Sequence, residues 1–191
     1  MTIKAQDVKE LREKTGLGMM ECKKALEEAN GNLEEAIKNL RKSSALKAEK
    51  KASRTAVEGI IISKISDNEI TFVEVNCETD FVAKDENFIN FCEEALKVAV
   101  DNSSVENLLD EVSERMEKQR MALVQKIGEN IIIRKVKKIT GEVLESYIHS
   151  NKKIAAGVSL DQGSPEIAKE VAMHIAASNP IVLSPEDLDE S

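Results

Sequence analysis

The sequence predicts an α+β protein in which a three-helix bundle is followed by a core of two related subdomains. Apolar residues recur at helical spacing three times within residues 1–42, which predicts three short helices. A β-rich hairpin followed by an amphipathic helix occurs twice in the remainder, which predicts a repeated unit. We therefore divide the chain into a three-helix domain at 1–42, a basic linker at 43–55, a first core subdomain at 56–140 and a second at 141–191.

Short breaks separate the three predicted N-terminal helices. Gly16 interrupts the chain after the first apolar face, and Gly31 can adopt the left-handed conformation that ends the second helix. Asn32 followed by Glu35 fits the start of the third helix, with a side-chain cap and a capping-box partner. Residues 43–55 are rich in Ser, Ala and Lys and carry no wide apolar stripe, so we expect a basic, partly helical linker.

Turn signals between β-rich runs mark the core elements. In the first subdomain we expect strands at residues 57–65 and 70–76, and then a helix with Phe88 and Phe91 on its apolar face. A long charged helix at about residues 105–127 and a strand at 130–139 should follow. In the second subdomain we expect strands at 143–149 and 153–160, and then a helix with Ile167 on its apolar face.

Composition excludes several classes of function. The net charge of -8 argues against general nucleic-acid binding, which needs a cationic surface. The three cysteines form no CxxC pair, no apolar signal segment opens the chain and no apolar run could span a bilayer, so we expect a cytoplasmic protein. Phosphate-binding glycine motifs and zinc-ligand spacing are absent from the sequence, so we expect no catalytic residue, no cofactor and no metal.

Residues 76–84, Asn-Cys-Glu-Thr-Asp-Phe-Val-Ala-Lys, stand between a predicted strand and a predicted helix. One interpretation is a helix start, in which Thr79 or Asp80 caps the first turn and Phe81 packs onto the core. The other is a protein contact, in which the strand end holds Asp80 and Phe81 outward. Met19 and Met20 form a second candidate contact, since a core as small as this bundle's cannot bury both.

Taken together, these segments resemble the bacterial elongation factor Ts family. The similarity runs through residues 11–26, 75–83, 126–131 and 173–178, in that order. The resemblance implies a ubiquitin-associated-like three-helix domain and a core of two subdomains. It also implies guanine-nucleotide exchange on elongation factor Tu, the GTPase that delivers aminoacyl-tRNA, with neither nucleic acid nor membrane as a direct partner.

The resemblance assigns roles to individual residues. Thr79, Asp80, Phe81 and Val82 match a segment that enters the GTPase near its magnesium and phosphate site; we call these four residues the wedge. The matches to docking residues are Arg12, Met19 and Met20 in the three-helix domain and His149 in the second subdomain.

The chain also departs from the family pattern. Residues 152–158, Lys-Lys-Ile-Ala-Ala-Gly-Val, replace the usual Gly-Arg turn and the strand after it, which puts the hairpin beside His149 in doubt. Ser43 stands where a Gly commonly ends the third helix. Family members continue past Leu188 with a dimerisation insert, a strand and a helix, so we expect an incomplete second subdomain with an exposed sheet edge. Homodimerisation is not carried over.

Three other functions stay open at this point. The three-helix domain alone would suit an adaptor for ubiquitin-like folds or nascent chains. A small hydrolase or transferase could use Asp80 with a distant carboxylate. RNA could bind through the basic residues at 47–54 and 134–138, although the net charge disfavours it.

Overall fold

A computed structural model describes residues 3–102, 107–182 and 184, and its mixture of helices and sheets agrees with the predicted class. Contacts divide the chain into two compact units that do not follow sequence order. The first holds the residues up to Glu58 together with Asn76–Phe91 and Ser113–Ile132. The second holds Gly59–Val75, Cys92–Val112 and the residues from Ile133 onward. The four domain boundaries drawn from the sequence stay a prediction.

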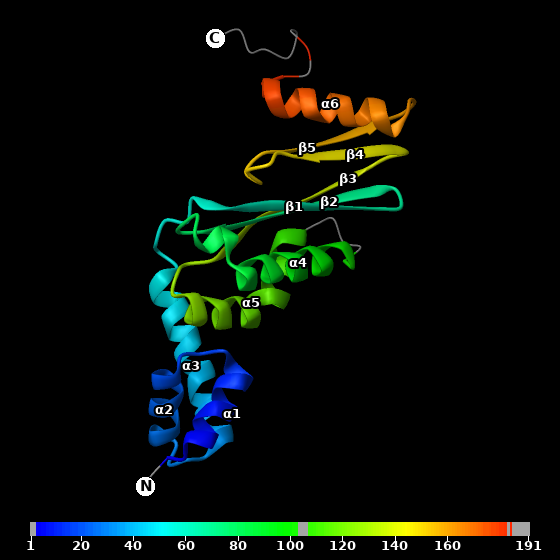
Figure 1. Cartoon of the computed structure of the whole chain (residues 1–191). Helices are drawn as coiled ribbons and strands as arrows, with labels where there is room; N and C mark the ends of the chain where they lie inside the picture. The colour runs from blue at the N-terminus through cyan, green and yellow to red at the C-terminus, as the bar shows by residue number, and fades with distance from the viewer. Residues whose placement is uncertain (1–2, 103–106, 183, 185–191) are drawn as a thin grey trace. The chain divides into compact units, whose positions relative to one another are not determined.

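The N-terminal helices of the first unit are α1 (Ala5–Thr15), α2 (Met19–Glu28) and α3 (Leu33–Lys51), shown in Figure 1. They pack around a small core that contains Leu11, Leu26 and Cys22. Two predicted boundary signals are confirmed: Gly31 has φ 82°, and the Asn32 side chain accepts from the Glu35 N–H at 3.0 Å. The capping-box prediction is wrong, because the Asn32 N–H instead donates to the Ala29 carbonyl at 2.9 Å. The ubiquitin-associated-like identity of this bundle stays a prediction.

The third helix does not end near residue 42 but continues to Lys51, through most of the predicted linker. Its buried residues Ala36, Leu40, Ser44 and Ala48 recur every four positions, so a single buried face continues beyond Ser43. The expectation that residues 43–55 are partly helical agrees with this, but the end of the third helix near residue 42 was placed too early, because that prediction required a stripe of large apolar residues. Small side chains such as Ser44 and Ala48 are buried in the same way where a neighbouring element comes close.

The second unit is built on two small sheets. Strands β1 (Glu58–Ser66), β2 (Glu69–Cys77) and β3 (Ile132–Thr140) form a sheet in that order. Strand β4 (Val143–Ile148) pairs antiparallel with β5 (Ala155–Leu160). Helix α6 (Pro165–Ser178) covers this hairpin, as Figure 1 shows, and buries Ala168 and Ala172 against it. The predicted strands and helices of the core lie within three residues of these bounds.

Helices α4 (Glu86–Val100) and α5 (Leu108–Ile127) each belong to both units. The charged helix predicted at about 105–127 corresponds to α5, and residues 105 and 106 lie outside the described residues. Residues 185–188, beyond which family members continue with further elements, also lie outside the described residues. The exposed sheet edge of the second subdomain stays a prediction. None of the described helices combines the length and apolar character needed to cross a membrane.

The hairpin that departs from the family pattern is nevertheless regular. Its register runs from Val143 opposite Leu160 to Ile148 opposite Ala155. Gly157 has a specific packing role in it, because a Cβ there would lie 2.7 Å from both Ile139 Cδ1 and Phe72 Cε2. Such distances are shorter than a carbon–carbon contact, so any larger residue here would require the Ile139 and Phe72 side chains to shift.

Candidate functional site

The wedge follows the end of β2 and precedes α4, as predicted. Thr79 Oγ1 accepts a long hydrogen bond of 3.4 Å from the N–H of Val82, the first residue of a short 3₁₀ turn at Val82–Lys84. The cap of α4 itself is Asp85, whose Oδ1 accepts from the Asn87 N–H at 2.8 Å and the Phe88 N–H at 3.4 Å. The helix-start interpretation was therefore wrong in its residues: Asp85, and not Thr79 or Asp80, caps the helix that follows.

Phe81 does not pack onto the core. Its side chain is 81% exposed, the largest such exposure among the aromatic residues that the structure describes, and Phe88 occupies the buried position instead. Asp80 is also at the surface, where it pairs with Lys84 Nζ at 2.8 Å. This hydrogen bond and the charge of Asp80 raise the pKa of Lys84. The wedge thus has a carboxylate and an aromatic ring exposed on two consecutive residues.

A pair of carboxylates holds the residues just before Asp80. Glu129 Oε2 accepts from the backbone N–H groups of Glu78 and Thr79, both at 3.0 Å, and Glu129 Oε1 accepts from the Thr79 hydroxyl at 2.7 Å. In return, Glu78 Oε1 accepts from the Asn130 N–H at 2.6 Å. We call this reciprocal arrangement of Glu78 and Glu129 the carboxylate clamp. It ties the exit of β2 to the segment that links α5 to β3.

Residues at the end of α3 support the clamp from the other side. The fully buried Asn130 donates through Nδ2 to the Arg54 carbonyl at 2.8 Å and to the Ala52 carbonyl at 3.3 Å. Lys51 Nζ donates to the Gly128 carbonyl, and Arg54 Nη1 lies 3.6 Å from Glu78 Oε1. Cations of the predicted basic linker thus have intramolecular partners.

Cys77 lies beneath the turn as a buried free thiol. Its Sγ donates to the Thr79 carbonyl at 3.2 Å. Burial, followed by the nearby charges of Glu129 and Glu58, raises the pKa of this thiol to about 12. Because the thiolate is the reactive form, Cys77 is a structural residue at neutral pH and not a nucleophile.

The predicted docking residues of the first unit, Arg12, Met19 and Met20, lie on α1 and α2, on either side of the loop between these helices. Gly16 has φ 67°, and the turn that it forms carries Leu17 into the core while Met19 and Met20 point outward, 60% and 74% exposed. Arg12 is exposed on α1. The prediction that at least one of the two methionines is exposed is confirmed. The Lys126 side chain covers Gly16 and donates to Asn87 Oδ1 at 2.6 Å.

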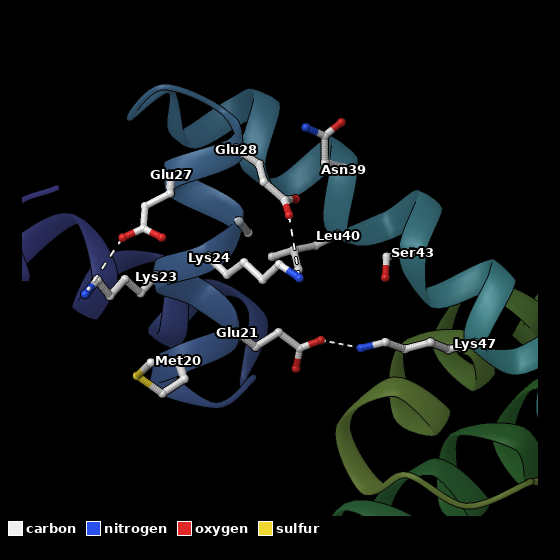
Figure 2. Close-up of a pocket in the computed structure, with 11 residues that line it drawn as sticks. Met20, Glu21, Lys23, Lys24, Glu27, Glu28, Asn39, Leu40, Ser43 and Lys47 are labelled. Atoms are coloured by element: carbon white, nitrogen blue, oxygen red, sulfur yellow. Dashed lines mark hydrogen bonds and ion pairs between the residues drawn. The ribbon is translucent and has the colours of Figure 1, made fainter. Parts of the chain in front are cut away.

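A groove of about 740 Å³ runs beside Met20 between α2 and α3 (Figure 2). Its charged residues are paired with one another: Lys23 with Glu27, Lys24 with Glu28, and Lys47 with Glu21. Glu21 also accepts from Gln125 Nε2 at 2.9 Å, which links α2 to α5. Partial burial opposes ionisation of Glu21, but the hydrogen bonds from Lys47 and Gln125 outweigh it, so the pKa of this carboxyl is lowered from 4.5.

The lowered pKa of Glu21 predicts a pH dependence of stability. A carboxyl with a depressed folded pKa contributes stability above its unfolded pKa, about 4.5, and loses it as the pH falls through the folded value. We expect Glu21→Gln to be less stable than the wild type at pH 7. Its free energy of unfolding should also fall less than that of the wild type between pH 5 and pH 3. Urea unfolding at several pH values would measure this, and parallel pH profiles for the two proteins would contradict it. The exposed Glu13→Gln serves as a control.

His149 belongs to the second unit, at the turn between β4 and β5. Its ring is exposed, and Nδ1 lies 3.0 Å from the Tyr147 hydroxyl. Its backbone N–H donates to the Ile154 carbonyl at 2.9 Å, and Lys152 supplies the left-handed residue with φ 56°. The turn is thus closed without the family's usual Gly-Arg pair. The structure groups the wedge, Arg12, Met19 and Met20 in one compact unit, whereas His149 lies in the other.

Among the described residues, part of each basic run considered for RNA has intramolecular partners, while Arg134, Lys135 and Lys137 are exposed. The described residues contain no group of three His, Cys, Asp or Glu side chains arranged to hold a metal ion. Of the basic residues at 134–138, Lys138 is only 3% exposed and lies 2.7 Å from Glu69 Oε1. Within the other basic run, Lys47, Lys51 and Arg54 also have intramolecular partners.

The clamp residues Glu78, Glu129 and Asn130 were not singled out from the sequence. Two of them lie in the segment 126–131, which was used only as a mark of resemblance. One signal in the sequence could have indicated them: Glu78 follows one predicted strand, and Glu129 and Asn130 lie at the start of another. That pattern is common on surfaces, so it could not by itself identify a clamp.

Comparison with known proteins places these features in context. A family model described as Elongation factor TS matches residues 78–191. The elongation factor Ts of Marinobacter nauticus is 55% identical over 188 residues, which cover 97% of this chain and 65% of that relative. Those of Hahella chejuensis and Teredinibacter turnerae are 50% and 52% identical and are each covered to 66%. The chain therefore spans slightly less than two thirds of these relatives.

Proposed function

Because this chain belongs to the elongation factor Ts family, we propose that it binds elongation factor Tu in its GDP form and accelerates release of GDP, so that GTP can bind. The proposed action is non-covalent and takes place in the bacterial cytoplasm. One observation carries most of the proposal: Phe81 is 81% exposed on a turn whose backbone is held by the carboxylate clamp. An exposed aromatic ring on a fixed backbone is typical of a protein contact, since little entropy is lost when it binds.

The mechanism we propose is differential binding. If the chain binds the empty GTPase more tightly than the GDP-loaded one, then by linkage GDP binds more weakly to the complex by the same free energy. The overall nucleotide equilibrium is unchanged, and a faster route opens through a ternary complex. The chain therefore needs no reactive group, and the unreactive Cys77 thiol agrees with this.

We assign the disturbance of the nucleotide site to the wedge. Insertion of the Phe81 ring would displace side chains near the magnesium site of the GTPase. Coordination of the ion by the loops and the phosphates would then weaken. Asp80 would exchange its contact with Lys84 for a contact in the complex. Such an exchange keeps the carboxylate paired in both states, which limits its desolvation cost.

The remaining site residues would hold the two proteins together. Met19 and Met20 offer a flexible apolar contact, and methionine adapts well to irregular partner surfaces. Arg12, exposed on α1, would add a charged contact. His149 would add a contact from the second unit, with its ring orientation set by the Tyr147 hydroxyl. Thr79 would act through the backbone of the turn, and Val82 through the apolar side of the wedge.

The direct test is release of a fluorescent GDP analogue from elongation factor Tu, followed by stopped flow with and without this chain. We expect the release rate to rise with chain concentration and to saturate. A rate that does not change with chain concentration would overturn the proposal. Capture from a bacterial lysate separates the alternatives: a bound RNA or a different GTPase would favour another function.

A further inference from the structure

We propose that Glu129 is the positioning residue of the wedge, and this inference rests on the proposed exchange function. Glu129 lies fifty residues after the turn in sequence, yet its carboxylate makes three hydrogen bonds to Glu78 and Thr79. These two residues directly precede Asp80 and Phe81. Glu129 therefore controls the direction in which the wedge leaves the sheet, without belonging to the exposed contact surface itself.

The geometry explains how one side chain can fix the turn. Glu129 Oε2 takes both backbone N–H groups, which sets the peptide planes on either side of Glu78, and Oε1 takes the Thr79 hydroxyl. The same Thr79 oxygen accepts from the Val82 N–H at the far end of the wedge. Thr79 Oγ1 thus takes part both in the clamp and in a hydrogen bond to the last residue of the wedge.

The chemistry also explains why a carboxylate suits this position. Hydrogen bonds that a carboxylate accepts are stronger than those between neutral groups, and a carboxylate offers about four lone-pair sites for its three donors here. If the side chain were removed, two backbone N–H groups at a strand exit would lose their acceptor. The turn would then sample other conformations, and ordering it again would oppose insertion of Phe81.

Three variants distinguish positioning from general stability. Glu129→Ala removes all three hydrogen bonds. Glu129→Gln can keep them, because its amide oxygen accepts from the two N–H groups while its NH₂ group donates to the Thr79 oxygen. Glu114→Ala removes an exposed carboxylate of α5 and serves as the charge control.

We expect Glu129→Ala to lower the GDP release rate at saturating chain about tenfold, equivalent to about 1.4 kcal/mol. The concentration that gives half of the maximal rate should change little, since Met19 and Met20 remain in place. Glu129→Gln should recover most of the rate, and Glu114→Ala should match the wild type. Equal saturating rates for Glu129→Ala and the wild type, or failure of Glu129→Gln to recover any of the loss, would overturn the positioning role.

A second measurement needs no GTPase. Amide hydrogen exchange of Glu78 and Thr79, followed by NMR in the isolated chain, should become faster in Glu129→Ala, while amides in the centre of β2 keep their protection. Unchanged amide hydrogen exchange at both Glu78 and Thr79 would overturn the inference, whatever the GDP release assay shows. If the wild-type chain itself failed to accelerate GDP release, the proposed function would fall, and the amide exchange would still decide whether Glu129 orders the turn.

Discussion

Replacing Phe81 with alanine should slow GDP release from the complex with elongation factor Tu about thirtyfold, which corresponds to about 2 kcal/mol. Aromatic residues at the centre of an interface commonly contribute this much, and this chain has only five aromatic residues and no Trp. Because the ring is 81% exposed in the isolated chain, its removal should leave the free energy of unfolding within about 0.5 kcal/mol of the wild type.

The measurement combines stopped-flow release of fluorescent GDP with urea unfolding of the same preparations. Leu46→Ala is the matched control, since it also removes an exposed apolar side chain, 59% exposed on α3, that has no assigned role in docking. We expect the control to retain the wild-type release rate. A Phe81→Ala protein as active as Leu46→Ala would show that the ring does not act as a wedge.

Replacing Leu11 with alanine should have the largest effect on stability, about 2–5 kcal/mol for the first unit. Leu11 is fully buried, and the bundle has few other large side chains in its core, so neighbouring residues cannot fill the cavity. A bundle of this size has little stability to lose. We therefore expect the three N-terminal helices to be largely unfolded at 37 °C, while the β4–β5 hairpin and α6 remain folded.

Backbone NMR spectra of the whole chain would show this selectively, as loss of dispersed signals from residues of α1, α2 and α3. In the GDP release assay, the half-saturating concentration should rise and the saturating rate should fall, because the bundle carries the docking residues and belongs to the same compact unit as the wedge. Leu46→Ala is again the control, since it removes an exposed apolar side chain of α3 that has no assigned role in docking and leaves the core intact. Unchanged signals from α1 in Leu11→Ala would contradict the prediction.

Much of the fold could be predicted because its signals are local. The apolar spacing that predicts α1, the turn at Gly31 and the β-rich runs of β1 and β2 each depend on residues within a few positions of one another. The continuation of α3 to Lys51 was missed because burial of Ser44 and Ala48 depends on a neighbour that the local pattern does not reveal. The same limit applies to Gly157, whose neighbours Phe72 and Ile139 come from other strands.

The candidate site also combines features that local sequence predicts with features that depend on distant residues. Residues 79–82 could be located from the strand and helix signals around them, but the local pattern favoured a helix start in which Phe81 packs onto the core. Its exposure follows from the position taken by Phe88 and from the clamp, and the clamp depends on Glu129, a partner fifty residues away. Composition and periodicity were therefore sufficient for the elements and their order. The direction of the wedge needed the tertiary structure, because hydrogen bonds between distant segments set it.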